Sequence, residues 1–525
     1  MLRVVLLLGG LLVGVLLPAQ RIETRLICHW VPGSVPRDAG RAKYPAQPGR
    51  QLAENITLLT FTDAATAEAT RAILRRNPAV RSVQYDWKVT FRSTPNDPLY
   101  ASQSNLRRSG FEAAWDLTTG GTTPDGTPIV TAVLDGGFDV DHEDLRASLW
   151  TNAAEIPGDG VDNDGNGLVD DLHGWDYAAG SGSLGTDTHG TQVAGIIGAR
   201  GDNDTGVAGT NWQSQLMLFT IATVSDIIAA YGYIIEQRSL HLRSAGQQGA
   251  LVVATNASFG IEGATCADFP VWGDMYDRLG EAGILTAASV VNLARDVDLA
   301  GDMPTDCPSE FLLGVTNVDT DDRLFPSAGY GSEHVDLGAP GEGSYTTRPG
   351  NRYGSFGSTS AAAPYVTGAI SLLYASPCPL LHQLARGDPP AAALLVRKSL
   401  LASVDESPSL QFRTSSGGRL NVAAAQRELL RYCTVEKSGN LEAVSVYPSP
   451  TSGSVRIITN AATLAEVPEV EVYDALGRRV RRGPTVLTSI FPVTVEADLA
   501  GLPGGWYLLR LRSDSQRASI PVLVR

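Results

Sequence analysis

Residues 353–374 restrict the fold of this chain more than any other stretch. They read YGSFGSTSAAAPYVTGAISLLY: small residues crowd around the hydroxyl of Ser360, and the apolar, alanine-rich pattern that follows predicts a buried helix. We expect Pro364 in the first turn, where a missing N–H costs little. Ser360 then lies at a helix N-terminus, where backbone N–H groups can stabilise negative charge. The stretch fits either an N-cap serine or a nucleophile.

Two further stretches can supply the partners of a nucleophilic serine. Residues 128–134 are β-branched and apolar, which predicts a buried strand, and Asp135 follows at the sheet edge where open α/β folds bind ligands. His189 opens a helical pattern of small and apolar residues, a setting that the six other histidines lack.

Asp135, His189 and Ser360 therefore form a possible catalytic triad at one sheet edge. In acyl transfer, Ser360 attacks a carbonyl, His189 takes its proton, and Asp135 orients the imidazole. An oxyanion hole completes such a site. We expect its donors to be the backbone N–H of Ser360 and the side-chain amide of Asn292.

Length, charge and cysteines indicate an exported protein of several domains. The 525 residues predict two to four domains, and a net charge of −15 argues against nucleic-acid binding. Residues 1–19 read as a signal peptide, and no later apolar run is long enough to span a membrane. Export favours disulfides. Without Cys28, four cysteines allow three pairings. Of these we expect Cys266–Cys307 and Cys378–Cys433.

The two ends of the chain differ in pattern from its middle. Residues 20–95 contain two strand patterns around a helix, a compact α+β module whose position suggests a removable propeptide. Prolines at 93–100 mark the joint to the next domain. From residue 441 onwards, short alternating strands separated by turn signals predict a small β-sandwich.

An acidic loop at residues 159–171 is a candidate metal site. Asp162, Asp164 and Asn166 fit the start of a calcium loop, but its twelfth position is His173, which excludes a standard EF-hand. A structural Ca²⁺ and a plain polar loop both remain open. The chemistry of a serine triad requires no cofactor, and the cysteine and histidine spacing gives no zinc site.

Three blocks resemble the subtilisin-like serine proteases (subtilases, peptidase S8). They are VLDGG at 133–137, HGTQVAG at 189–195 and STSAAAP at 358–364, in the family order Asp, His, Ser, within a resemblance that covers residues 96–435. It implies an α/β fold with a mainly parallel seven-stranded sheet flanked by helices. It also implies endopeptidase activity on protein or peptide substrates through an acyl-enzyme, and an inhibitory propeptide at 20–95.

The same resemblance assigns further residues. It implies a substrate cleft lined by Asn256, Ser258, Phe259 and Gly260, and family calcium positions at Asp144 and Asn203. Three positions depart from the family pattern: Ser358 and Val291 replace glycines, and Gln192 replaces a second histidine. The departures at Ser358 and Val291 motivate an alternative, a catalytically inactive subtilase fold used as a binding module.

The last 85 residues resemble the C-terminal sorting domain of type IX secretion cargo. The matching pieces are VYPSPTSG at 446–453, VYDALGR at 472–478 and LPGGWYL at 502–508. The resemblance implies a Gram-negative, Bacteroidetes-like bacterium, the type IX machinery as a partner, and secretion or placement on the outer-membrane surface. A carbohydrate- or protein-binding β-sandwich is the alternative.

Overall fold

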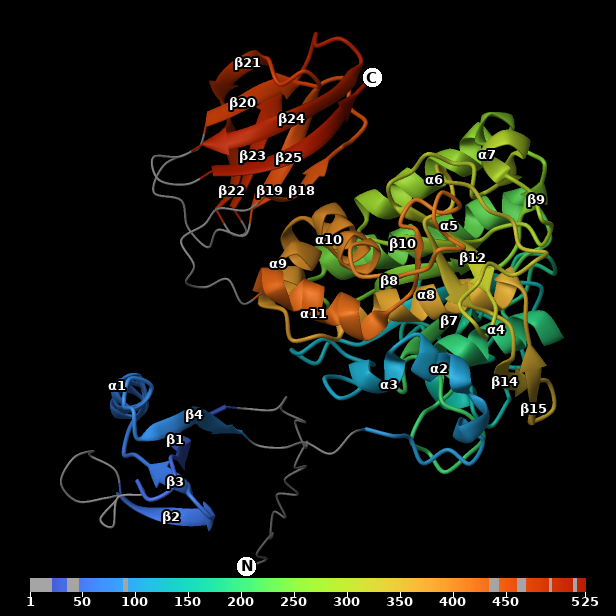
Figure 1. The fold of residues 1–525 in the computed structure, drawn as a ribbon. Helices are drawn as coiled ribbons and strands as arrows, with labels where there is room; N and C mark the ends of the chain where they lie inside the picture. Colours follow the sequence, from blue (N-terminus) through green and yellow to red (C-terminus); the bar gives the residue numbers. More distant parts are fainter. Residues whose placement is uncertain are drawn as a thin grey trace, which may run out of the picture. The chain divides into compact units, whose positions relative to one another are not determined.

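The computed structural model describes residues 21–34, 47–87, 93–433, 443–459, 469–490, 493–512 and 517–525 (Figure 1). The chain divides into two compact units, residues 1–92 and residues 93–525. The predicted signal peptide, residues 1–19, lies outside the described residues. Within them, the structure contains no helix with the length and apolar character that a membrane span requires.

The first unit is an antiparallel sheet with one helix. Its strands are β1 (Arg21–Trp30), β2 (Gln47–Ala53), β3 (Ile56–Thr60) and β4 (Val80–Trp87), in the order β2-β3-β1-β4, and its helix is α1 (Ala64–Leu74). Asp63 caps α1 by accepting a hydrogen bond from the Thr66 N–H at 2.8 Å. The enclosed core includes Leu26, Trp30, Leu59 and the free Cys28.

A nine-stranded sheet forms the centre of the second unit. Its order is β16-β17-β13-β12-β10-β8-β5-β7-β6, and the pairing is parallel everywhere except between the edge strand β16 and its neighbour β17. The predicted α/β class with a mainly parallel sheet is confirmed; two strands of two residues each extend it from seven to nine. The bounds are β5 Ile129–Asp135, β6 Gly174–Asp176, β7 Gln215–Thr220, β8 Leu251–Ala257, β10 Leu285–Ser289, β12 Leu312–Val318, β13 Leu337–Pro340, β16 Asp405–Glu406 and β17 Gly418–Arg419.

Helices cover both faces of this sheet (Figure 1). Two neighbouring residues of β8 belong to the apolar clusters on the two faces of the sheet. Val253 packs in the cluster with α8, α10 and α11, whereas Val252 packs in the cluster with α5 and α6. All sixteen residues of α8 are buried, so this helix forms the centre of one layer. The helix bounds are α2 Ser104–Arg108, α3 Phe111–Ala114, α4 Thr188–Gly198, α5 Val224–Arg243, α6 Pro270–Glu281, α7 Val297–Ala300, α8 Thr359–Tyr374, α9 Pro379–Gly387, α10 Pro389–Leu401 and α11 Val422–Cys433.

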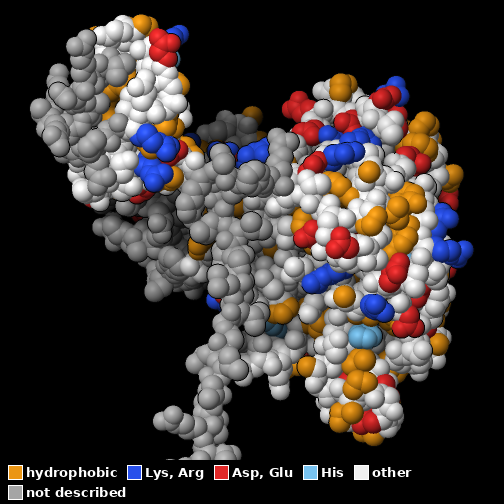
Figure 2. Space-filling view, turned by 90° about the horizontal axis from the view of Figure 1, so that it is seen from below, with side chains coloured by type: hydrophobic (Ala, Val, Ile, Leu, Met, Phe, Trp, Pro, Cys, Tyr) orange, Lys and Arg blue, Asp and Glu red, His pale blue; other side chains and the backbone are white. Residues whose placement is uncertain are grey.

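Two short ribbons lie outside the main sheet. β9 (Ile261–Glu262) pairs with β11 (Asp302–Met303), and β14 (Ser344–Arg348) pairs with β15 (Arg352–Phe356). On the face shown in Figure 2, acidic and basic side chains are interspersed and the described residues form no continuous basic surface. This distribution agrees with the acidic net charge.

The C-terminal region is the predicted β-sandwich. One sheet has the order β18-β19-β23-β22 and the other β21-β20-β24-β25, and their inner faces enclose one apolar cluster that includes Val455, Val472 and Leu509. The bounds are β18 Ala443–Tyr447, β19 Ser454–Thr459, β20 Glu469–Asp474, β21 Arg479–Pro484, β22 Val486–Ile490, β23 Val493–Asp498, β24 Gly505–Arg512 and β25 Arg517–Val524.

Both expected disulfides are present. Cys266 pairs with Cys307 and Cys378 with Cys433, across 41 and 55 residues of sequence. The second bridge ties the start of α9 to the last residue of α11. Crosslinks over such loops stabilise a fold mainly by restricting the unfolded chain, by about 2–4 kcal/mol each.

Candidate active site

Asp135 and His189 meet where β5 ends and α4 begins. Asp187 caps α4, and its Oδ1 accepts hydrogen bonds from the N–H groups of His189 at 2.7 Å and Gly190 at 3.3 Å. Nδ1 of His189 lies 2.9 Å from both carboxylate oxygens of Asp135, which is 6% exposed. A Cβ at Gly190 would come within 2.2 Å of the Gly137 carbonyl oxygen, so this approach of helix to strand requires glycine.

This contact sets the protonation of the imidazole. A carboxylate can only accept, so Nδ1 carries the proton and Nε2 is left with a lone pair. Burial of the ring lowers the pKa of His189, but the hydrogen bond to Asp135 and the charges of Asp135 and Asp187 outweigh it and raise the pKa above its usual 6.5. His189 can therefore serve as a base once the pH exceeds this raised pKa.

Ser360 is the second residue of α8 and is 8% exposed. Because α8 begins at Thr359, Pro364 is the sixth helical residue, and our expectation that it lies in the first turn was wrong. A proline there cannot donate to the carbonyl four residues earlier, which is that of Ser360. Oγ of Ser258 donates to this carbonyl instead, at 3.1 Å, and so replaces the missing helical hydrogen bond.

A chain of hydrogen bonds holds Ser258 in place. Thr367 Oγ1 donates to Oδ1 of Asn256 at 2.9 Å, and Nδ2 of Asn256 donates to Oγ of Ser258 at 2.9 Å. Asn256 has no exposed surface, and both ends of its amide point inward. We therefore assign Asn256 to support of Ser258 rather than to the cleft surface for which we had named it.

The hydrogen bonds of Asn292 orient its amide. Its Oδ1 accepts from the N–H of Thr359 at 3.0 Å and from Oγ1 of Thr359 at 2.8 Å. A backbone N–H can only donate, so the bonded end must be the oxygen and Nδ2 is the other end. Nδ2 makes no hydrogen bond within the described residues, and the residue is exposed beside the start of α8. It is a free donor next to Ser360.

A cavity of about 310 Å³ opens beside the Asp135–His189 pair. Its walls are mostly apolar, and they include three of the residues named for the substrate cleft. Ser258, Phe259 and Gly260 line it together with Ile221, Val224, Ile227, Ile261 and Trp272. Helices α4 and α8 lie against each other, although no hydrogen bond joins Ser360 to His189 in the described residues. Such bonds are often long until substrate binds.

Ser358, the residue before α8, has a conformation that suits glycine. Its φ is 67° and its ψ is −175°, a region that residues with a Cβ rarely enter. Its N–H donates to Oε1 of Glu342 at 2.8 Å, and the same oxygen accepts from Nδ2 of Asn317 at 3.0 Å. The strained geometry is thus held by partners outside the helix.

We predict that Ser358→Gly stabilises the protein. Relief of strain contributes about 1–3 kcal/mol, and the greater freedom of glycine in the unfolded chain offsets about 0.5–1 kcal/mol of it. The free energy of unfolding from denaturant titration should rise, with kcat changed by less than about threefold. An unchanged or lower free energy of unfolding would show that the backbone here is not strained.

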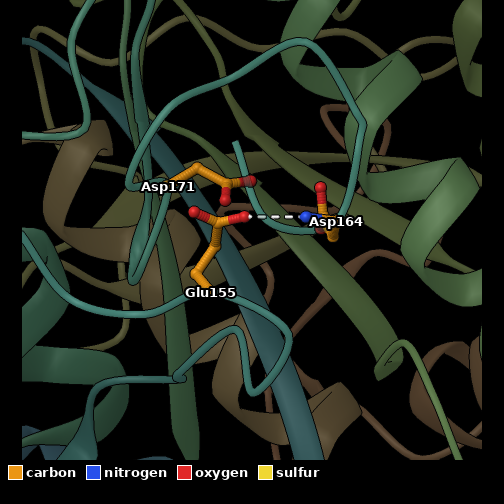
Figure 3. A group of neighbouring side chains, drawn as sticks. All are labelled: Glu155, Asp164 and Asp171. Atoms are coloured by element: carbon orange, nitrogen blue, oxygen red, sulfur yellow. Dashed lines mark hydrogen bonds between the residues drawn. The ribbon is translucent and has the colours of Figure 1, made fainter. Parts of the chain in front are cut away.

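Three carboxylates gather in and beside the acidic loop. Oxygens of Glu155, Asp164 and Asp171 lie within 4.8 Å of one another, and Figure 3 shows the three groups converging. Asp171 is fully buried, and burial raises its pKa. The hydroxyl of Tyr233, also buried, faces Asp171, and burial and the charge of Asp171 raise its pKa.

Only Asp164 of our three candidates in this loop belongs to the group. Asp162 accepts the N–H groups of residues 165–167 and so shapes the turn, and Nδ2 of Asn166 donates to Asp164 at 3.2 Å and Asp171 at 2.9 Å. Sequence reasoning missed Glu155 because it lies outside the acidic run. It also missed Asp171, which stands in that run at a position the calcium-loop pattern does not use.

The other two calcium candidates also lie together. Asp144 is fully buried; its Oδ1 accepts from Nδ2 of Asn203 at 2.9 Å and its Oδ2 from the N–H of Val207 at 2.9 Å. Burial raises the pKa of Asp144 to about 7, and the charge of Asp97 adds to the rise. Oδ1 of Asp97 is itself buried and accepts no hydrogen bond from the described residues. Calcium at Asp144 and Asn203 stays a prediction.

Comparison with known proteins identifies two regions of the chain. Residues 126–384 match the Subtilase family, and residues 445–525 match the Secretion system C-terminal sorting domain. The chain therefore carries a subtilase domain followed by a secretion sorting domain. Both resemblances found in the sequence are confirmed.

Several curated proteases are similar to this chain. Subtilisin-like protease 1 of Plasmodium vivax is 28% identical over 318 residues, 56% of this chain and 46% of the relative. The thermophilic serine proteinase of Bacillus sp. (strain AK1) is 29% identical over 316 residues, 58% of this chain and 66% of the relative. The chain thus spans less than half the length of the first Plasmodium relative. A solved protease from Pseudoalteromonas arctica is 23% identical with a TM-score of 0.46, covering 64% of this chain and 100% of that one.

Proposed function

We propose that this protein is an exported serine endopeptidase that hydrolyses peptide bonds by acyl transfer. The observation that carries the proposal is the Asp135 carboxylate at 2.9 Å from Nδ1 of His189, beside the N-terminus of the helix that bears Ser360. The subtilase match of residues 126–384 supports the same reading.

The proposed reaction proceeds in two halves. Ser360 Oγ attacks the substrate carbonyl while Nε2 of His189 takes its proton, and Asp135 stabilises the resulting imidazolium. The Ser360 N–H and Nδ2 of Asn292 donate to the oxyanion. His189 then gives its proton to the leaving amine, and water hydrolyses the acyl-enzyme by the same sequence of proton transfers.

A fluorophosphonate probe separates this proposal from an inactive binding module. Such a probe phosphonylates a serine only where a base activates it. We expect stoichiometric labelling of Ser360, identified by peptide mass spectrometry, and loss of peptide hydrolysis in the same sample. A folded, mature protein that neither reacts with the probe nor cleaves peptides would be a binding module.

The raised pKa of His189 predicts the pH profile. Protonated His189 cannot accept the Ser360 proton, so kcat/KM should fall as pH drops through the raised pKa, with a midpoint above 6.5. Asp187→Asn keeps the helix cap but removes one of the charges that raise the pKa, so it should move the midpoint down. A midpoint below 6.5, or a flat profile between pH 5 and 8, would contradict the role of His189.

The rest of the chain fits an export route. We propose that residues 1–19 direct export, that residues 20–95 inhibit the peptidase until they are removed, and that the peptidase domain spans residues 96–435. We further propose that residues 441–525 are read by the type IX secretion machinery, which releases the protein or places it on the outer-membrane surface. The sorting-domain match of residues 445–525 supports this last step.

We propose a structural Ca²⁺ at Glu155, Asp164 and Asp171. Three converging carboxylates, one of them fully buried, suit a hard divalent cation, and Asn152 and Asn166 bring amide groups to the same place. This cluster takes no part in the acyl-transfer chemistry, so the ion would order the loop between β5 and β6.

Removal of calcium should therefore lower stability rather than chemistry. At a calcium concentration 100-fold above its Kd, binding adds about 2.7 kcal/mol, so chelation by EDTA should lower Tm by several degrees and added Ca²⁺ should restore it. Asp171→Asn should shrink this calcium-dependent shift, whereas the control Asp321→Asn, which removes an exposed carboxylate elsewhere, should not. If chelation does not change Tm, residues 159–171 form a polar loop without a bound calcium ion.

A further inference from the structure

Asp302 is a buried acid that the proposed mechanism does not use. It is 3% exposed, and its Oδ2 accepts hydrogen bonds from Oγ1 of Thr305 at 2.8 Å and from the N–H of Val291 at 2.9 Å. No described residue donates to Oδ1, and this atom is not among the described side-chain oxygens that are sealed without a partner. Oδ1 therefore keeps some contact with solvent although the residue around it is enclosed.

Two segments that flank Ser360 converge on Asp302. β11, which starts with Asp302, pairs with β9, and β9 directly continues the cleft segment Ser258–Gly260. A Cβ at Gly260 would lie 2.4 Å from the carbonyl oxygen of Met303, so the two segments touch. On the other side, the bond from Val291 places Asp302 next to Asn292.

The charge of Asp302 is not neutralised within the described chain. None of the ion pairs of the described residues includes it, and burial raises its pKa to about 6, with Glu262 and Asp306 adding to the rise. An isolated carboxylate in a low-dielectric setting costs several kcal/mol unless a cation compensates it. A positively charged group placed next to Asp302 would therefore be stabilised by a carboxylate that no other cation compensates within the described chain.

A bound peptide would bring one side chain to this place. The residue that contributes the attacked carbonyl has its oxygen at Nδ2 of Asn292 and its carbonyl carbon at Ser360. If its backbone runs along Ser258–Gly260, its side chain starts between that segment and Val291–Asn292. Asp302 adjoins both segments: its Oδ2 accepts from the Val291 N–H, and the next residue, Met303, contacts Gly260. Lysine and arginine have stems long enough to carry a cation several ångströms inward.

We propose that Asp302 selects substrates with arginine or lysine at the residue whose carbonyl is attacked. This proposal rests on the proposed endopeptidase function and narrows its substrate class. Asp302 is a specificity-determining residue here; it takes no proton and forms no bond in the reaction.

Matched peptides test the wild-type protein directly. The test measures kcat/KM of the mature, secreted protein on fluorogenic peptides. These peptides differ only at this residue and carry arginine, citrulline or leucine there. Citrulline has the shape of arginine without its charge. We expect the arginine peptide to be cleaved at least about 10-fold faster than the other two, since truncating one member of a buried charge pair has effects of this size or larger.

A conservative variant tests whether the charge of Asp302 causes the preference for arginine. Asp302→Asn keeps an oxygen that can accept from Val291 and Thr305 but removes the charge, so the arginine-to-citrulline ratio of kcat/KM should fall at least about 10-fold. Asp306→Asn is the matched control: it removes a neighbouring charge from a residue whose carboxylate accepts from the Cys266 N–H instead, and should keep the ratio.

The outcomes separate the two proposals. Equal cleavage of arginine and citrulline peptides by a protein that the fluorophosphonate probe labels would overturn the role of Asp302 and leave the endopeptidase standing. Failure of both labelling and cleavage would overturn the endopeptidase and the inference with it. The wild-type comparison alone decides the preference if Asp302→Asn does not fold.

Discussion

Ser360→Ala should lower kcat by about a million-fold, a magnitude known for the same change in subtilisin and carried over through the family relationship. The reason is the loss of the attacking oxygen, which no neighbouring group replaces. Oγ of Ser360 makes no hydrogen bond within the described residues, whereas its carbonyl is held by Ser258. The fold should therefore survive, and the far-ultraviolet circular dichroism and Tm should match those of the wild type.

Ser355→Ala provides the matched control for this experiment. Ser355 is an exposed serine five residues upstream, in β15, and its carbonyl rather than its hydroxyl is used as an acceptor. It should retain kcat within about threefold. If Ser360→Ala in a purified, folded sample still hydrolyses peptides within tenfold of the wild-type rate, the nucleophile is a different residue.

Asn292→Leu should lower kcat by about 100- to 1000-fold and leave KM nearly unchanged; this size, too, is that of the corresponding donor in subtilisin. Nδ2 makes no hydrogen bond within the described residues and lies next to the start of α8, so its interaction with the substrate's oxyanion develops mainly in the transition state. Because Oδ1 also holds Thr359, the variant should lose about 1–2 kcal/mol of stability as well.

Thr359→Val distinguishes the two roles of Asn292. It removes the hydroxyl that donates to Oδ1 but keeps the backbone N–H donor and the free Nδ2. We expect a loss in kcat of less than about tenfold, from looser positioning alone. A comparable loss in both variants would assign Asn292 to holding the start of α8 rather than to the oxyanion.

The sequence could predict the parts of this site that depend on local pattern. A run of β-branched and apolar residues ending in Asp135 is sufficient to predict β5 and the carboxylate at its edge, because a fully buried parallel strand has no polar alternation. His189 is likewise placed by the small-residue pattern of α4. Leaving out Cys28 reduced the cysteine pairing to three possibilities, and the structure shows the pairing that we expected.

Features that depend on contacts between distant segments could not be predicted. Glu155 joins Asp164 and Asp171 only through the path of a loop, and no sequence spacing encodes that path. The inward orientation of Asn256 depends on Thr367, more than a hundred residues away. Asp302 is the clearest case: its sequence context is ordinary for a loop acid, and only the pairing with β9 and the hydrogen bond from Val291 bring it close to Asn292.

The position of the Cys378–Cys433 disulfide matters for cleavage between the peptidase domain and the C-terminal β-sandwich. Cys433 closes α11, and the sandwich begins with β18 at Ala443, so the crosslink lies entirely on the peptidase side of this junction. A protease that cuts the chain between Cys433 and Ala443 would release the sorting domain. It would not cut inside any loop that a disulfide of the peptidase domain closes. The peptidase domain would thus keep both of its disulfides after the sorting domain has been removed.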